Sequence, residues 1–323
     1  MENQRERLVI SVDQYIEYRR EGYLIVRNLL SEEETNRLQQ WADDIYSGKI
    51  TKLDILSPMP KWMEGQDKSE RLASARIHMP HVLDETAEWA LMHPKVLDVL
   101  EALIGPDVAG LQSMLFFNPP GKGGQGWHQD SFYIQTQPDS LIGVWIALDR
   151  ADQDNGCLWV APGSHHEPIY PPPKIRETYM HAHTRQIKGL FSAENASHMD
   201  DDINQLSEVA AKYGQAVPVV LEPGDVLFFH SHLLHRSYRN ETSDRYRRAY
   251  VCHYCNAHSW VPWKHHIPEE AGVAENKHLL VRGRTDQPHI KPRFGHPVEL
   301  TRRSDQGAIS VAMPGGDMGT MEM

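Results

Sequence analysis

The sequence predicts a mainly antiparallel β fold with flanking helices, and three observations support this prediction. After Gly105 the chain consists of short β-rich runs separated by Gly, Pro, Asn and Asp, with no helical pattern between them. Before Gly105 the chain contains helix patterns with clear start and stop residues. The 323 residues are 40% hydrophobic and 24% charged, which is typical of a globular chain with a sizeable core. A sandwich or barrel therefore fits this pattern better than a βαβ fold.

Residues 1–105 are expected to form a helical layer. The segment "SVDQYIEYRREG" offers Ser11 as a helix N-cap and Gly22 as a stop, and the following "YLIVRNL" is typical of a short strand. The segment "SEEETNRLQQWADDIY" begins with Ser31 and has Glu34 three residues later, which is the pattern of a capping box. These signals predict two helices with a strand between them.

A third helix is expected directly before the β-rich part of the chain. In "HPKVLDVLEALIG" the apolar residues recur at helical spacing, Pro94 stands early, and Gly105 follows the last turn. The β-rich runs come next in the order "VAGLQSMLFFN", "LIGVWIALD", "GCLWVAPGS", "AVPVVLEPGDVLFFH" and "RRAYVCHYCN". They predict a β core over about 106–260.

The domain organisation follows from these patterns. A polar, His-rich stretch at about 166–215 interrupts the β-rich runs and is interpreted as a lid insertion. The last residues, 304–323, are rich in Gly and Met and are expected to form a flexible tail. Residues 1–303 are therefore predicted to form a single domain.

Charge and composition limit the classes of partner and location. A formal net charge of −11 argues against a broad nucleic-acid-binding face. No apolar run approaches the length that crosses a bilayer, and the first residues lack the pattern of a secretory signal. The three cysteines cannot all pair with one another, which suits a reducing cytoplasm. We therefore expect a cytoplasmic protein with a small-molecule substrate, and the sequence leaves its oligomeric state open.

The stretch "WHQDSFYI", which follows the flexible "NPPGKGGQ", carries the first candidate metal ligands. If it forms a strand, His128 and Asp130 project on the same side while Gln129 points away. An imidazole and a carboxylate could then meet at one metal ion. They would supply two of the three ligands in the 2-His-1-carboxylate group of non-haem Fe(II) oxygenases. The alternative is a surface His-Asp pair at a strand edge.

A third ligand has to come from a distant part of the chain. The apolar run in "EPGDVLFFHSHLLHRSYRN" ends with His230, His232 and His235, and spacing alone does not choose among them. Downstream, Arg247 and Arg248 begin another β-rich run, and alternation sends one inward and the other outward. A buried guanidinium needs an anionic partner, which a dicarboxylate cosubstrate would supply.

Several stretches together resemble the phytanoyl-CoA dioxygenase family of Fe(II)/2-oxoglutarate-dependent oxygenases. They are "EGYLIVRNLLSEEE", "SMLFFNPPG", "HQD", "DSLIGVWIALD", "DNGCLWVAPGSH", "GDVLFFHSHLLHRS" and "RRAYVCHY", in the order the family has them. The resemblance implies a double-stranded β-helix, or jelly roll, of the cupin type. It places the metal on His128, Asp130 and His235, and it assigns the carboxylate of 2-oxoglutarate to Arg247. It also suggests that four further residues line the cosubstrate pocket: Met114, Gln129, Trp145 and Ser237.

The resemblance further implies the cofactors and the reaction. Fe(II), 2-oxoglutarate and O₂ would together hydroxylate an unactivated C–H bond of a small molecule, with release of succinate and CO₂. Related halogenases lack the carboxylate ligand, so Asp130 favours hydroxylation over chlorination. The alternative functions are a cupin-like metal-binding protein and a non-redox metalloenzyme on the same barrel.

The sequence departs from the family pattern at one point that concerns the cosubstrate. The acyl-CoA hydroxylase that gives the family its name has a lysine that helps to bind 2-oxoglutarate, whereas the corresponding stretch here, "SARIHMPH", has none. Arg76 and His78 are the candidates for this second contact. The stretch "NAHSWVPWKHHIPEEAG" also matches poorly, so the identity of the substrate does not follow from the family name.

Overall fold

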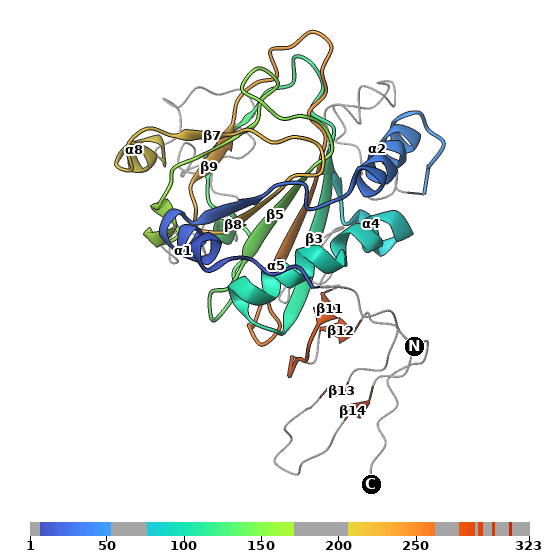
Figure 1. Cartoon of the computed structure of the whole chain (residues 1–323), viewed down its shortest axis with the longest axis vertical. Helices are drawn as coiled ribbons and strands as arrows, with labels where there is room; N and C mark the ends of the chain where they lie inside the picture. Colours follow the sequence, from blue (N-terminus) through green and yellow to red (C-terminus); the bar gives the residue numbers. More distant parts are fainter. Residues whose placement is uncertain are drawn as a thin grey trace, which may run out of the picture.

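Two antiparallel sheets with a layer of helices make up the part of the chain that the structure describes (Figure 1). The structure is a computed structural model and describes residues 7–52, 76–170, 206–261, 278–287, 290–292, 299–300 and 310–311. The paired sheets with helices on one side are the architecture that the β-rich runs and the resemblance predicted, a cupin-like jelly roll.

The larger sheet contains eight strands. Their order is β1 (Tyr23–Val26), β8 (Val226–His230), β5 (Ile142–Ala147), β10 (Ala249–Asn256), β3 (Val108–Phe116), β11 (Leu279–Arg282) and β12 (Lys291–Pro292), and β2 (Ile77–His78) also pairs with β3. All neighbours are antiparallel except β11 and β12. The long strands β3 and β10 lie at the centre, so both have neighbours along most of their length.

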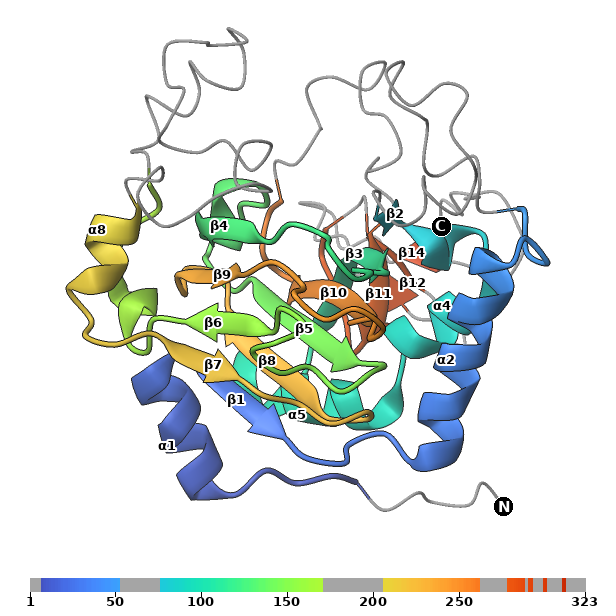
Figure 2. The ribbon, with the colours of Figure 1, turned by 90° about the horizontal axis from the view of Figure 1, so that it is seen from above.

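The smaller sheet has four strands in the order β4 (Gln125–His128), β9 (His235–Ser237), β6 (Leu158–Val160) and β7 (Val217–Val219). It packs on the inner face of the larger sheet (Figure 2). The apolar cluster between the sheets takes Met114 and Trp145 from the larger sheet and Val160 and Val219 from the smaller one. Two short strands, β13 (Glu299–Leu300) and β14 (Ser310–Val311), pair with each other.

The helices begin and end where local chemistry predicts. They are α1 (Val12–Glu21), α2 (Glu32–Tyr46), α4 (Glu85–Leu91), α5 (Pro94–Ile104) and α8 (Leu206–Ala211), with 3-10 turns at Pro80–Val82, Asp130–Phe132 and Ser164–His166. Ser11 and Ser31 each cap a helix within a complete capping box. Gly22 ends α1 in the left-handed conformation, as its role as a stop residue requires.

A second apolar core lies between the larger sheet and the helices. Leu38 and Trp41 of α2 and Leu100 of α5 belong to it, together with Phe228 of β8 and Tyr250 of β10. Because successive residues of a strand face opposite ways, the alternate residues of β8 and β10 are left to face the smaller sheet. Burial on both faces explains why most residues of these two strands are apolar.

Most element predictions are confirmed, and one strand was predicted too long. The five β-rich runs contain β3, β5, β6, β7, β8 and β10, and the third predicted helix is α5. The run "WHQDSFYI", however, leaves the strand conformation after Gln129 and continues as a 3-10 turn. The turn forms because Tyr133 and Ile134 donate backbone hydrogen bonds to the carbonyl of Asp130.

Some predictions concern residues that the structure does not describe. Most of the predicted lid, 171–205, lies outside the described residues, as does the predicted tail except for residues 310–311. The single domain over 1–303 stays a prediction. Among the described helices, none combines the length and the apolar character that crossing a bilayer requires.

Candidate functional site

A cavity of about 330 Å³ lies between the two sheets. Side chains from β3, β4, β5, β8, β9 and β10 line it, together with Tyr133 and Ile134, which follow the 3-10 turn. Apolar side chains, such as Met114, Phe116, Trp145, Phe229 and Val251, form part of the wall, and polar or charged side chains form another part. A cavity of mixed character at the centre of a sandwich is the expected place for a small-molecule site.

Three potential metal ligands converge at this cavity. The Nε2 atoms of His128 and His235 each lie 3.7 Å from Oδ1 of Asp130, and the two imidazole rings are 4.0 Å apart between centroids. One ligand atom from each side chain falls within 4.8 Å of the other two. Among the described residues this is the only group of three or more His, Cys, Asp or Glu with such spacing.

Backbone carbonyls orient both imidazoles. Nδ1 of His128 lies 2.8 Å from the carbonyl of Gly126, and Nδ1 of His235 lies 2.9 Å from the carbonyl of Leu233. A carbonyl oxygen only accepts hydrogen bonds, so each Nδ1 carries the proton and each Nε2 presents a lone pair to the cavity. The two rings are therefore in the tautomer that binds a metal through Nε2.

The electrostatics favour the metal-binding forms of His128 and Asp130. Burial, followed by repulsion from His235, lowers the pKa of His128 to about 3, so that imidazole is neutral at physiological pH. Burial alone would raise the pKa of Asp130, but His235 and His253 outweigh it and hold that pKa well below its usual range. Two imidazoles and one carboxylate are the donor set that suits Fe(II), so the residues present fit this ion.

Strand pairing brings the two histidines together across 107 positions of sequence. His128 at the end of β4 is the cross-strand partner of His235 at the start of β9. Gln129 is still extended, with φ −124° and ψ 130°, so Asp130 returns to the same side as His128 although the strand has ended. Of the three histidines that spacing left open, His235 is therefore the candidate for the third ligand.

The other two histidines of that run lie elsewhere. Nδ1 of His232 donates to the carbonyl of Glu167, and its Nε2 lies 3.1 Å from Oδ2 of Asp139. His230 has its Nε2 3.9 Å from the same carboxylate oxygen. Neither histidine lines the cavity.

Arg247 reaches the cavity as the inward arginine. It is buried, its Nε donates to the carbonyl of Gly156 at 3.0 Å, and its guanidinium lies 5.7 Å from the ring of Trp145. No carboxylate of the described residues forms an ion pair with it, whereas Arg248 points outward and pairs with Asp149 and Asp43. Burial lowers the pKa of Arg247 to about 10, which leaves it charged at neutral pH.

The remaining predicted pocket residues divide into two groups. Met114, Trp145 and Ser237 line the cavity, as the resemblance suggested. Gln129 is not among the lining residues, so its place in the cosubstrate pocket stays a prediction. Its side-chain nitrogen donates to the carbonyls of Pro168 and His232, and its oxygen accepts from the backbone N–H of Tyr170. The side chain of Gln129 thus binds the backbone of the segment that follows the 3-10 turn at Ser164–His166.

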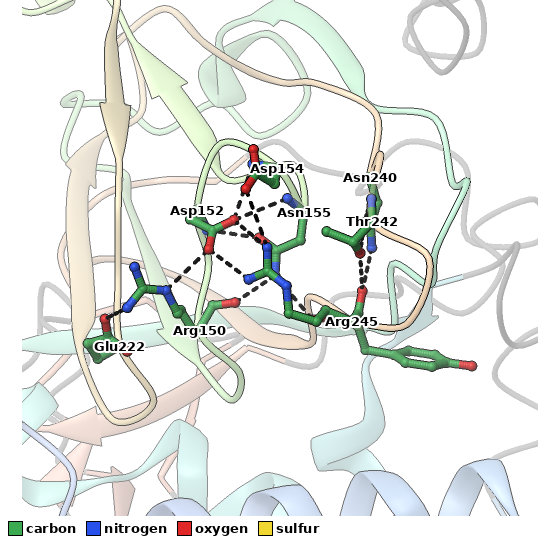
Figure 3. A network of polar contacts seen from close by, with 9 residues as sticks. Arg150, Asp152, Asp154, Asn155, Glu222, Asn240, Thr242 and Arg245 are labelled. Carbon is green, nitrogen blue, oxygen red and sulfur yellow. Dashed lines mark hydrogen bonds and ion pairs between the residues drawn. The ribbon is translucent and has the colours of Figure 1, made fainter.

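A polar network supports the turn that precedes Arg247 (Figure 3). Arg245 donates two hydrogen bonds to the carboxylate of Asp152, at 2.7 and 3.1 Å. Asn155 donates to the backbone carbonyl of Tyr246, and Asn240 donates to the neighbouring carbonyl of Arg245. The network therefore links the turn at residues 152–156, which supplies the carbonyl partner of Arg247, to the start of β10.

Sequence reasoning missed His253. It lines the cavity, and its Nε2 lies 2.9 Å from Oδ2 of Asp130. Alternation along β10 could have indicated it, because residues 247, 249, 251 and 253 share one face of the strand. The contact with Asp130, which is 123 residues away, has no signal in the sequence.

Arg76 and His78 both line the cavity, at different levels. His78 is the cross-strand partner of Met114, and Nε2 of Gln112 lies 3.4 Å from its Nδ1. The guanidinium of Arg76, two residues earlier on the same face, lies 5.6 Å from the ring of Phe116. Phe116 is in turn the partner of Ala249, which follows Arg247 by two residues. The register therefore places Arg76 closer than His78 to the level of Arg247.

Comparison with known proteins gives one family match. The model of the family "Phytanoyl-CoA dioxygenase (PhyH)" matches residues 18–249. A curated relative, "Phytanoyl-CoA dioxygenase, peroxisomal" of Bos taurus, is 28% identical over 281 residues, which cover 84% of this chain and 75% of the relative.

Solved structures share the fold. A protein described as a non-heme monooxygenase, ThoJ, is similar with a TM-score of 0.58 and 23% identity, over 87% of this chain and 88% of that one. The epimerase SnoN, solved with Fe³⁺, alpha ketoglutarate and nogalamycin RO, has a TM-score of 0.54 and 19% identity, over 76% of this chain and 84% of that one. These likenesses support the jelly-roll fold.

Proposed function

The chain belongs to the phytanoyl-CoA dioxygenase family, and from this premise we propose which residues carry its reaction and what kind of molecule it acts on. Membership makes it an Fe(II)/2-oxoglutarate-dependent dioxygenase. The single observation that supports the site assignment is the convergence of His128, Asp130 and His235 on one face of the central cavity. We assign the metal to these three side chains.

Bound Fe(II) and 2-oxoglutarate supply the chemistry that activates O₂, releases succinate and CO₂, and hydroxylates a C–H bond. The chain would hold the ion through Nε2 of His128, Nε2 of His235 and Oδ1 of Asp130. Its sandwich walls exclude bulk water, because Trp145, Phe229 and Val251 cover the inner side of the cavity. The carboxylate of Asp130 supports hydroxylation rather than halogenation as the outcome.

Arg247 binds the distal carboxylate of 2-oxoglutarate in this proposal. Its charge is buried and has no ion-pair partner among the described residues, so an incoming dicarboxylate would supply the missing anion. Ser237, which also lines the cavity, adds a hydroxyl, and Trp145 and Met114 add apolar contact with the cosubstrate carbons.

Arg76 is our choice for the second carboxylate contact. Arg76 lies near Phe116, whose cross-strand partner Ala249 follows Arg247 by two residues. His78 instead pairs with Met114, which is further from Arg247 along the sheet. Burial lowers the pKa of Arg76, because an environment poor in water disfavours the charged form.

The substrate is proposed to be a small molecule. The cavity volume of about 330 Å³ lies at the lower end of the range for small-molecule sites. It must hold 2-oxoglutarate as well. A macromolecule could enter it only as one side chain or one end.

Formation of succinate from 2-oxoglutarate tests this function. Wild-type protein with Fe(II), O₂ and a panel of candidate metabolites should release succinate in a substrate-dependent way, and Asp130→Ala and His235→Ala should reduce the rate by at least 100-fold. Full turnover by either variant would overturn the assignment. Turnover of a substrate with Zn(II) under nitrogen would indicate a non-redox metalloenzyme instead.

The location and domain organisation complete the proposal. We assign the protein to the cytoplasm, because all three cysteines are buried and unpaired. The bovine relative is named as peroxisomal, so cell fractionation decides between the two compartments. One dioxygenase domain over residues 1–303 is supported by the family match across 18–249.

A further inference from the structure

We propose that His253 is a positioning residue for the metal, one that holds Asp130 so that a single carboxylate oxygen faces the ion. This inference rests on the proposed function, because it presupposes that Asp130 is a ligand. Neither the family pattern nor the sequence assigned His253 a role.

The two oxygens of Asp130 have separate partners. Oδ1 lies 3.7 Å from Nε2 of His128 and 3.7 Å from Nε2 of His235, which is the arrangement of three donors around one ion. Oδ2 lies 2.9 Å from Nε2 of His253. The carboxylate is thus divided between a metal side and a protein side.

The proton of this hydrogen bond belongs to His253. A carboxylate only accepts, so Nε2 of His253 must donate. The other ring nitrogen, Nδ1, is buried and has no hydrogen-bond partner among the described residues. A proton on Nδ1 would leave a buried donor unsatisfied, which costs about 1–3 kcal/mol. Both nitrogens therefore favour the tautomer that donates to Asp130.

The position of His253 in the sheet makes it a rigid support. It lies on the central strand β10, where Gln112 of β3 and Gly143 of β5 are its cross-strand partners. Its side chain is only 3% exposed. Asp130, by contrast, lies in a 3-10 turn just beyond the end of β4 and gains no support from strand pairing. The ligand on the less regular element is thus held by a side chain on the more regular one.

Loss of this hydrogen bond should weaken metal binding. Without it, Oδ2 becomes an unsatisfied buried acceptor and the carboxylate is free to rotate. Partners of metal ligands of this kind typically contribute 10–100-fold to metal affinity. The effect should concern the metal rather than 2-oxoglutarate, whose distal carboxylate we assign to Arg247 on another part of the wall.

Three substitutions separate the hydrogen bond from packing. In His253→Gln the amide nitrogen can reach the place of Nε2 and donate to Asp130. In His253→Asn the amide is too short to do so, and His253→Leu removes all polarity. His93→Leu is the matched control, because His93 is also fully buried and has its Nε2 3.0 Å from a carboxylate oxygen of Glu34, away from the cavity.

The measurement is an anaerobic titration of the full-length apoprotein with Co(II), followed by calorimetry and by the visible absorption of the bound ion. We expect the Kd for Co(II) to rise 10–100-fold in the Asn and Leu variants and to stay within about threefold of wild type in the Gln variant and the His93→Leu control. At saturating metal, the Kd for 2-oxoglutarate should stay within about threefold in all of them. Thermal denaturation of each apoprotein reports whether it is folded.

Each outcome decides a different point. Asn and Leu variants that bind Co(II) as tightly as wild type would overturn the role of His253, and so would a Gln variant as weak as the Asn variant. If the Leu variant does not fold, the Gln and Asn pair still carries the comparison. If wild-type protein itself binds no Co(II), it is the proposed metal site that fails, and this result is distinct from the first two.

Discussion

Substitution of Arg247 by methionine should weaken the binding of 2-oxoglutarate strongly without destabilising the apoprotein. Methionine matches the unbranched apolar stem of arginine and removes the guanidinium together with its charge. The buried guanidinium has a single described hydrogen bond from Nε, to the carbonyl of Gly156, and no ion pair within the described residues. A buried charge without an ion pair costs folding free energy, so we expect this guanidinium to bind an anionic ligand.

The magnitudes follow from burial and hydrogen bonding. Burial lowers the pKa of Arg247 from 12.5 to about 10, a shift that corresponds to roughly 3 kcal/mol against the charged form. Loss of the bond to Gly156 offsets about 1–2 kcal/mol of that gain. The apoprotein should therefore be as stable as wild type or slightly more stable. Two charge-assisted hydrogen bonds to a carboxylate contribute roughly 3–6 kcal/mol, so the Kd for 2-oxoglutarate should rise at least 100-fold.

Calorimetric titration of 2-oxoglutarate into metal-loaded protein and thermal denaturation of the apoprotein check the two parts separately. Arg248→Met is the matched control, since Arg248 is the next residue but points outward to Asp149 and Asp43. The control should keep its affinity within about twofold and lose some stability. A Kd for 2-oxoglutarate within tenfold of wild type in Arg247→Met would contradict this prediction. An equal rise of the Kd in the Arg248→Met control would contradict it as well.

Three further predictions concern the surroundings of the site. In Gly143→Ala the new Cβ would stand 2.2 Å from the ring of Phe229, so unfolding in denaturant should show a loss of about 1–3 kcal/mol; an unchanged midpoint would contradict this. The hydrogen bond from Arg245 lowers the pKa of Asp152 to about 2, below its unfolded value of about 4, so the stabilisation is complete above pH 4 and is lost as the pH falls towards 2. Asp152→Asn should flatten that part of the stability–pH curve, and an unchanged slope would refute the assignment. Gln129→Ala should lower the thermal midpoint but leave the Kd for 2-oxoglutarate within about twofold, and a large rise in that Kd would return Gln129 to the pocket.

The sequence predicted the elements well because their signals are local. The caps at Ser11 and Ser31, the stop at Gly22 and the β-rich composition of β3, β5, β8 and β10 depend on neighbours within a few positions. The strand that was expected through "WHQDSFYI" ended early, because the backbone bonds to the carbonyl of Asp130 favoured a turn over further pairing.

The parts of the site that depend on local sequence could likewise be predicted, and the parts that depend on contacts between distant residues could not. Alternation alone placed His128 and Asp130 on one side and turned Gln129 away, and the structure agrees with that reasoning. The resemblance instead assigned Gln129 to the pocket, where the structure does not place it. The choice of His235 depends on the pairing of β4 with β9, and spacing within the run could not reveal that contact.

An anaerobic crystal structure of the protein with Fe(II) and 2-oxoglutarate would test the assigned metal and cosubstrate sites together. We expect one metal ion bound by Nε2 of His128, Nε2 of His235 and Oδ1 of Asp130, with the distal carboxylate of 2-oxoglutarate on Arg247. A metal ion bound away from these three side chains, or a cosubstrate carboxylate that does not contact Arg247, would contradict it.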